Sequence, residues 1–165
     1  MKTSALPVLI VVGVVVTAAC TFRDTDKELK EYLESVDDIE ELFTAGMEEI
    51  GADRPWFFGV GDPPSSWSQE RLRGDVIATV SEVIALADSA CRAVSTLDPP
   101  EQAAQFNAKF QALLCDYAGG MRDARTAVER GDLVALSSLA LLSYEYDRRV
   151  SDVAAERERL GKKVN

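Results

Sequence analysis

Residues 94–110, VSTLDPPEQAAQFNAKF, decide the fold because they end one helical pattern and start another. Pro99 and Pro100 suit the first turn of a helix, where a missing N–H group has no partner to lose. Asp98 can cap that turn, and Glu101 lies close to the positive end of the helix dipole. Because the connection is short, the two helices that it joins are expected to be antiparallel neighbours.

The same periodicity extends outward from this turn in both directions. Apolar residues recur three or four positions apart over four segments, which is the spacing of one face of a helix. The stripes are Leu29, Tyr32, Val36, Ile39, Phe43, Met47 and Ile50; Leu72, Val76, Val80, Val83, Ala87, Ala90 and Val94; Ala103, Phe106, Phe110, Leu113, Tyr117, Met121, Ala124 and Val128; and Leu133, Leu136, Leu139, Tyr146, Val150, Val153 and Leu160. We therefore predict an all-α fold, an antiparallel helical bundle of about four helices. A repeat solenoid is the weaker alternative, because the segments share no fixed period.

Local signals predict where these helices begin and end. Thr25 and Glu28 form a capping box ahead of the first stripe, and Gly51 follows its last turn. The second helix is expected to start near residues 66–68. The Gly131-Asp132 pair is expected to end the third helix and to cap the fourth.

The composition excludes several classes of function. The chain has 165 residues, which fits one domain, and its 18 basic and 28 acidic residues give a formal charge of −10. A domain this acidic repels phosphate backbones, so we expect no nucleic acid partner. The chain has no histidine, which removes the commonest general base and the imidazole metal ligands. Since it also has no nucleophile elbow, phosphate loop or zinc spacing, we expect no enzyme, no metal site and no cofactor.

Residues 1–20, MKTSALPVLIVVGVVVTAAC, have the three-part layout of a secretory signal. Lys2 supplies a short positive region, and residues 8–16 form an apolar run that only a glycine interrupts. The small residues Thr17-Ala18-Ala19 then lead to Cys20. An apolar run of this length is too short to span a bilayer comfortably.

The ending Thr-Ala-Ala-Cys20 resembles the lipobox of bacterial prolipoproteins, although Thr17 stands where that family usually has leucine. The resemblance implies a diacylglyceryl group on the Cys20 thiol and cleavage directly before it. Residues 1–19 would then be a cleaved signal peptide, and residues 20–24 a lipidated cysteine with a short tether. We expect a lipid-anchored protein on the extracytoplasmic face of a cell membrane or outer membrane. Two alternatives stay open: an uncleaved anchor helix over residues 5–22, and an ordinary secretory signal with an unmodified Cys20.

Cys91 and Cys115 are the two cysteines left to the exported domain, and export favours a disulfide between them. If the chain turns near residue 99, one cysteine lies 8 residues before the turn and the other 16 after it. That mismatch is roughly 12 Å of helix rise, against a Cα separation of about 5.5 Å in a disulfide. A connector that steps outward at 95–100 would close part of the gap. A bridge, two buried free thiols and a link between chains therefore all remain open.

Residues 51–67, GADRPWFFGVGDPPSSW, form the one long connector of the bundle domain predicted over residues 25–165. This connector holds both tryptophans of the chain, at positions 56 and 67, together with Phe57 and Phe58. Aromatic side chains of this kind can plug the open end of a bundle, and they can also anchor a ligand or partner. Long connectors often carry function, so the connector is a candidate contact site.

Together these observations predict a non-enzymatic, membrane-anchored helical interaction module of the cell envelope. Its partner would be another envelope protein or a second copy of the chain. The alternative is a binder of small apolar ligands, with its site between the helices under the 51–67 connector.

Overall fold

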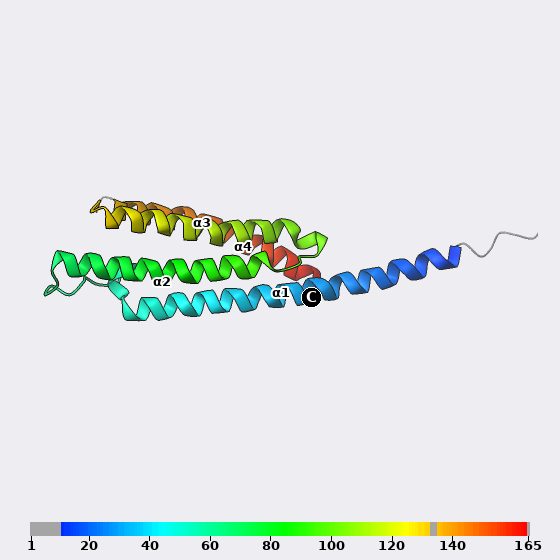
Figure 1. The fold of residues 1–165 in the computed structure, drawn as a ribbon. Helices are drawn as coiled ribbons and strands as arrows, with labels where there is room; N and C mark the ends of the chain where they lie inside the picture. Colours follow the sequence, from blue (N-terminus) through cyan, green and yellow to red (C-terminus); the bar gives the residue numbers. More distant parts are fainter. Residues whose placement is uncertain (1–10, 133–134, 165) are drawn as a thin grey trace, which may run out of the picture.

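The computed structural model describes residues 11–132 and 135–164, with side chains for residues 25–132, 146 and 148–164. Its elements are the helices α1 (Val11–Asp53), α2 (Gln69–Ser95), α3 (Ala104–Glu129) and α4 (Ala135–Val164), and the 3-10 turns η1 (Pro55–Phe58) and η2 (Glu101–Ala103). These described ranges contain no strand. The prediction of an all-α bundle of about four helices is confirmed (Figure 1).

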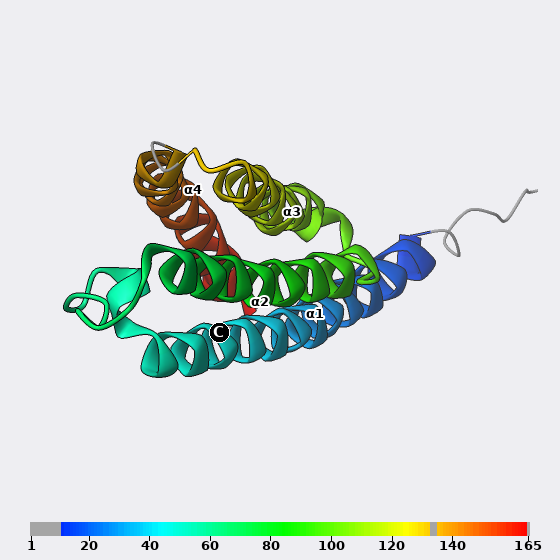
Figure 2. The same ribbon diagram turned by 60° about the vertical axis from the view of Figure 1, so that its left-hand side comes forward.

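The helices are arranged in chain order, and neighbours in the chain run in opposite directions. α2 packs against α1 and α3, and α4 packs against α3 and α1 (Figure 1). α4 meets α1 toward its C-terminal end, whereas its N-terminal half lies away from α1 (Figure 2). The N-terminal part of α1 extends beyond the other helices, at the end of the bundle opposite the connector (Figure 1).

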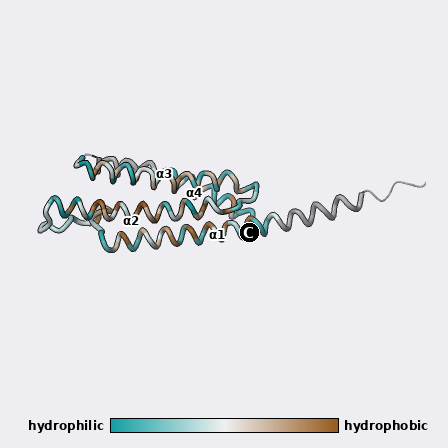
Figure 3. Tube along the Cα trace, in the orientation of Figure 1, coloured by the Kyte–Doolittle hydropathy of each residue, from teal (hydrophilic) through white to brown (hydrophobic). Residues whose placement is uncertain are grey.

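Most described residues of the apolar stripes face inward and form two core clusters, one toward each end of the bundle. The cluster near the α2–α3 turn includes Leu29, Val36 and Phe106, all with no exposed surface. The cluster near the connector includes Val80 and Val83, which are also completely buried. Each such side chain contributes about 1.5–3 kcal/mol on burial, so these stripes supply most of the stabilisation. Along the coloured helices hydrophobic and hydrophilic positions alternate, as expected for amphipathic elements (Figure 3).

The ends of α1 differ from the prediction. The helix starts at Val11 and runs through Thr25 and Glu28, so the expected capping box lies inside a helix rather than at its start. The helix also continues past Gly51 to Asp53. The residue that ends it is Pro55, because a proline disfavours the helical conformation of the residue before it, and residue 54 has φ −136° and ψ 60°.

The start of α2 matches the prediction, and the start of α3 does not. Ser68 caps α2, with its Oγ accepting a hydrogen bond from the N–H of Arg71 at 3.2 Å. Asp98 does not cap α3, because two successive prolines hold the chain extended and Pro100 has ψ 154°. The chain first forms η2 and becomes α-helical only at Ala104.

The end of α3 is closed by the predicted glycine. Gly131 has φ +83°, a left-handed conformation that costs glycine little. Its N–H donates to the carbonyl of Val128 at 3.0 Å, and the N–H of Asp132 donates to the carbonyl of Ala127 at 3.0 Å. These two bonds form a Schellman motif, which satisfies carbonyls that the helix end would otherwise leave free. Part of the chain between this motif and α4, residues 133–134, lies outside the described residues, so capping of α4 stays a prediction.

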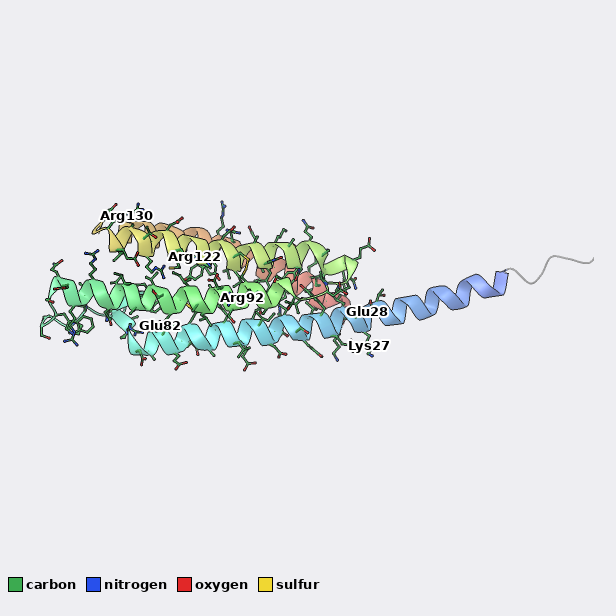
Figure 4. All side chains as sticks on the ribbon, in the orientation of Figure 1. Lys27, Glu28, Glu82, Arg92, Arg122 and Arg130 are labelled. Carbon is green, nitrogen blue, oxygen red and sulfur yellow. A yellow bond between two sulfur atoms is a disulfide. The ribbon has the colours of Figure 1, made fainter. Side chains whose placement is uncertain are left out.

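Ion pairs cross the contacts between helices. Figure 4 labels two of the residues concerned, Glu82 on α2 and Arg122 on α3. The pairs between elements are Arg54–Glu82, Arg54–Asp75, Arg122–Asp88, Lys109–Glu156, Arg149–Asp116, Arg157–Asp37 and Arg157–Glu40. Each pair is at least partly exposed, and such pairs contribute only about 0–1 kcal/mol each, so they help to determine which helices pack together while the apolar core supplies the stability.

Candidate functional site

The aromatic residues of the connector come together at one end of the bundle. Trp56 meets Trp67 edge to face at 6.1 Å between ring centres, and Phe57 at 6.0 Å. Trp56 and Phe57 are partly buried and pack against the core cluster near the connector. Phe58 and Val60 are 40% and 68% exposed. The inner aromatics therefore close the end of the bundle, as the plug interpretation predicts, while the outer pair of apolar residues faces solvent.

A pocket of about 550 Å³ lies under this connector, a size within the range of small-ligand sites. We call it the connector pocket. Its walls combine the two indoles with three carboxylates and one guanidinium. The residues that line it are Asp53, Arg54, Pro55, Trp56, Val60, Asp62, Pro64, Trp67 and Asp75. A site for a purely apolar ligand was predicted here, and the pocket is more polar and more acidic than that prediction implies.

Arg54 is the one basic residue in the wall of the connector pocket, and its charge is already paired. Its two terminal nitrogens donate to the carboxylate oxygens of Glu82 at 2.8 and 3.0 Å. Its Nε lies 3.6 Å from Asp75 Oδ1. The hydrogen bonds to Glu82 raise the pKa of Arg54 above its already high ordinary value, so the guanidinium is held in place as a cation. This bidentate pair ties the start of the connector to α2.

A second cavity, of about 450 Å³, lies on the side of the bundle between α1, α3 and α4. We call it the lateral cavity. Apolar side chains form most of its wall, in contrast to the connector pocket. Its lining residues are Glu40, Phe43, Thr44, Phe110, Leu113, Leu114, Tyr146, Val150, Val153, Ala154, Arg157 and Glu158. The sequence does not predict this cavity, because most of its apolar residues fit the stripes of an ordinary core. Its wall comes from α1, α3 and α4, and no local pattern records how these three helices lie relative to one another.

Charged residues line part of the lateral cavity. Arg157 of α4 donates a hydrogen bond to Asp37 of α1, and its Nε lies 3.6 Å from Glu40 Oε2. Its positive charge is therefore shared between two carboxylates. Burial raises the pKa of Glu40 above 4.5, because the partly covered carboxylate loses hydration.

A cluster of aromatic rings adjoins the lateral cavity and joins the same three helices. Tyr117 of α3 meets Tyr146 of α4 at 4.4 Å and Phe43 of α1 at 6.4 Å between ring centres. Burial raises the pKa of Tyr117 to about 12, and burial has the same effect on Tyr32. Both phenols therefore keep their protons at neutral pH and are poor general bases.

Cys91 and Cys115 form a disulfide, with their Cα atoms 5.2 Å apart. Of the three alternatives left open by the sequence, the structure therefore contains the disulfide within the chain. The register argument against it assumed a tight turn near residue 99. Instead, residues 96–100 leave α2 and carry the chain further along the bundle before η2 begins (Figure 1). Residues 97–100 lie outside any helix and can span up to about 13 Å, which offsets the unequal helix lengths on the two sides of the turn.

Cys20, the predicted lipidation site, lies within the backbone range of α1, but its side chain is outside the described side chains. The first ten residues of the predicted signal peptide are likewise outside the described part of the chain. Within the residues that the structure describes, no helix is long and apolar enough to cross a membrane. The same residues bring together no group of three histidine, cysteine, aspartate or glutamate side chains that could hold a metal ion.

Comparison with known proteins identifies no match for this chain among protein families, curated proteins or solved structures.

Proposed function

We propose that this chain is a lipid-anchored, extracytoplasmic helical module that binds a protein partner of the cell envelope and has no catalytic role. The observation that carries the proposal is the sequence Thr17-Ala18-Ala19-Cys20 directly after an apolar run. Two acyl chains on such a cysteine hold a protein stably at a bilayer, whereas the acidic domain has little attraction to an anionic surface.

The shape of the bundle supports this proposal and suggests which end faces the partner. The N-terminal part of α1 extends from the end of the bundle that carries the α2–α3 turn (Figure 1). At about 1.5 Å per residue, residues 25–53 of α1 span roughly 40 Å. A lipid on Cys20 would therefore present the connector, with its exposed Phe58 and Val60, far from the membrane. That end is available to a partner in the envelope.

The anchor is tested by the intact mass of the chain from membrane and soluble fractions of a bacterial host. We expect the wild-type chain in the membrane fraction, without residues 1–19 and with the mass of acyl groups added. The Cys20→Ala variant should keep its N-terminal segment and carry no lipid. The Cys91→Ser variant is the matched control, since it also removes a cysteine and should be cleaved and acylated normally. Normal cleavage and retention of Cys20→Ala would show that the anchor proposal is wrong.

The contact surface is tested by placing a photo-crosslinking residue at position 58 or at position 152 of the membrane-bound chain. Phe58 is exposed on the connector, whereas Asp152 is exposed on α4 away from it. We expect a discrete adduct from position 58 and a weaker or absent one from position 152. Equal labelling from both positions would argue against a partner at the connector end.

The lateral cavity favours a second candidate function, the binding of a small apolar ligand. Its wall is largely aliphatic and aromatic, and its volume of about 450 Å³ accommodates a small molecule. Native mass spectrometry of the chain purified from membranes should show an added mass that organic solvent extracts. Ala154→Phe would place a ring in the cavity and remove that mass, whereas Ala155→Phe, at a neighbouring residue that does not line the cavity, would leave it. Retention of the mass in Ala154→Phe, or its absence from the wild type, would exclude this function.

A further inference from the structure

The charges around the connector pocket are unbalanced. Three aspartates line it, at positions 53, 62 and 75, and Arg54 is the only basic residue among its lining residues. Arg54 is hydrogen-bonded to Glu82 and ion-paired with Asp75, so its single positive charge leaves most of the nearby carboxylate charge unbalanced. The pocket is therefore negative, on a chain whose formal charge is already −10. Such a site attracts cations and repels anions over a distance set by salt screening.

The aromatic wall adds a second element of cation recognition. The face of an indole attracts a cation through its quadrupole, and tryptophan is the best of the aromatic residues for this contact. The indole of Trp67 already makes one such contact within the chain, since the guanidinium carbon of Arg71 lies 4.8 Å from its ring centre. Trp56 lies edge to face against the same ring. Two indoles and three carboxylates thus line the same cavity.

An inorganic ion does not fit this arrangement. In the part of the chain with described side chains, no three acidic, cysteine or histidine groups converge closely enough to hold a metal. A volume of about 550 Å³ is also much larger than an ion needs. The walls of the pocket suit an organic cation, in which the positive charge is delocalised over an apolar group or attached to one.

We propose that the connector pocket binds a small organic cation, an ammonium or guanidinium group on an apolar body, between its tryptophans and its aspartates. This proposal is independent of the lipid anchor and of any ligand in the lateral cavity. The recognised group can belong to a free amine or to a lysine or arginine side chain of a partner, because both present the same chemistry to the pocket.

The fluorescence of the chain reports on this pocket alone, because the only two tryptophans are Trp56 and Trp67. The full chain in a nonionic detergent is titrated with choline at constant ionic strength, and in parallel with 3,3-dimethylbutan-1-ol, its uncharged isostere. We expect a saturable change in tryptophan emission with choline. The uncharged alcohol should bind about tenfold more weakly, because it lacks the charge that makes the ion-pair and cation–π contacts. N-acetyl-lysine amide, titrated in the same way, tests the protein source of the cation. Saturable binding of either cation supports the proposal, and the tighter of the two identifies the source.

Matched variants test the role of the carboxylates. Asp53 and Asp62 are exposed, so the Asp53→Asn/Asp62→Asn variant should fold normally and weaken cation binding by about threefold or more. Asp152→Asn removes an exposed carboxylate from α4 and should leave the affinity unchanged. No saturable response to any cation, equal binding of choline and the alcohol, or full affinity in the double variant would each overturn the proposal.

Discussion

At the scale of single residues, Glu156 on α4 and Glu40 on α1 respond to burial and pairing in opposite ways. Glu156 is 11% exposed and accepts a hydrogen bond from Lys109 Nζ at 2.5 Å. That hydrogen bond lowers the pKa of Glu156 below 4.5, although burial acts in the opposite direction. Burial raises the pKa of Glu40, which has the weaker contact with Arg157 at 3.6 Å. One charge therefore stabilises the fold, and the other opposes it.

For Glu156 we predict a loss of stability in acid. Its pKa is lower in the folded chain than in the unfolded one, so its contribution is present above pH 4.5 and is lost as the pH falls through the folded value. Glu156→Gln should lower the free energy of unfolding by about 1 kcal/mol at pH 7, and by less at pH 3. Denaturant titrations at the two pH values measure this. The exposed Glu158→Gln is the control and should change stability by less than about 0.5 kcal/mol at either pH. The same loss at both pH values would contradict the assignment.

For Glu40 we predict the opposite sign. Because its pKa is higher in the folded chain, the folded state favours the protonated form, and the contribution to stability is lost as the pH rises through that pKa. Glu40→Gln should therefore stabilise the fold slightly at pH 7, by a few tenths of a kcal/mol after solvent screening, and leave it unchanged at pH 3. The same denaturant titrations apply. A clear destabilisation at pH 7 would mean that the pairing with Arg157 outweighs the cost of burial.

At the scale of the elements, the helix ends depend on a few backbone conformations. Pro55 ends α1, Ser68 caps α2, and the Schellman motif at Gly131 ends α3. Ser68 and Gly131 were recognisable because each acts through its own local chemistry. The start of α1 was not recognisable in this way. A capping box starts a helix only where the residues before it are not helical, and here they are.

Gly131 and Gly119 make a matched pair for testing this. Alanine at position 131 would have to adopt φ +83°, so Gly131→Ala should destabilise the fold by about 1 kcal/mol. Gly119 lies inside α3, and a Cβ added there meets no atom within 4 Å. Gly119→Ala should therefore stabilise the fold by about 0.5–1 kcal/mol. The melting temperatures of the two variants measure these changes. A shift of the same sign in both would contradict the assignment of Gly131 as the residue that ends α3.

At the scale of the whole molecule, the contacts between helices differ in kind. α2 and α3 are joined covalently by the Cys91–Cys115 disulfide, in addition to their apolar contact. α1 and α4 contact each other through side chains alone, including the Arg157 pairs, and the lateral cavity lies beside that contact. We therefore expect the α2–α3 hairpin to be the most stable part of the bundle and the α1–α4 contact to open first.

The disulfide should stabilise the whole bundle by restricting the unfolded chain. The two cysteines are 24 residues apart, for which loop-closure entropy gives about 3 kcal/mol. Cys91→Ser/Cys115→Ser should lower the free energy of unfolding by about that amount, and reductant should destabilise the wild type but not the variant. Denaturation of the full chain in detergent measures both effects. Cys20→Ser should leave the effect of reductant intact, and an unchanged stability of the reduced wild type would contradict the prediction.

The sequence by itself determined the fold class, the four amphipathic segments, the start of α2 and the end of α3, because periodicity and turn chemistry act over a few neighbouring residues. It also located both tryptophans in one connector. The tertiary structure decided the register of α2 against α3, and with it the disulfide, because the path of residues 97–100 sets how far the two helices are offset. Tertiary structure likewise decided that α4 diverges from α1 and that three aspartates line the same pocket as the tryptophans. These features depend on the relative positions of distant segments, and such positions follow from the packing of all four helices rather than from any one of them.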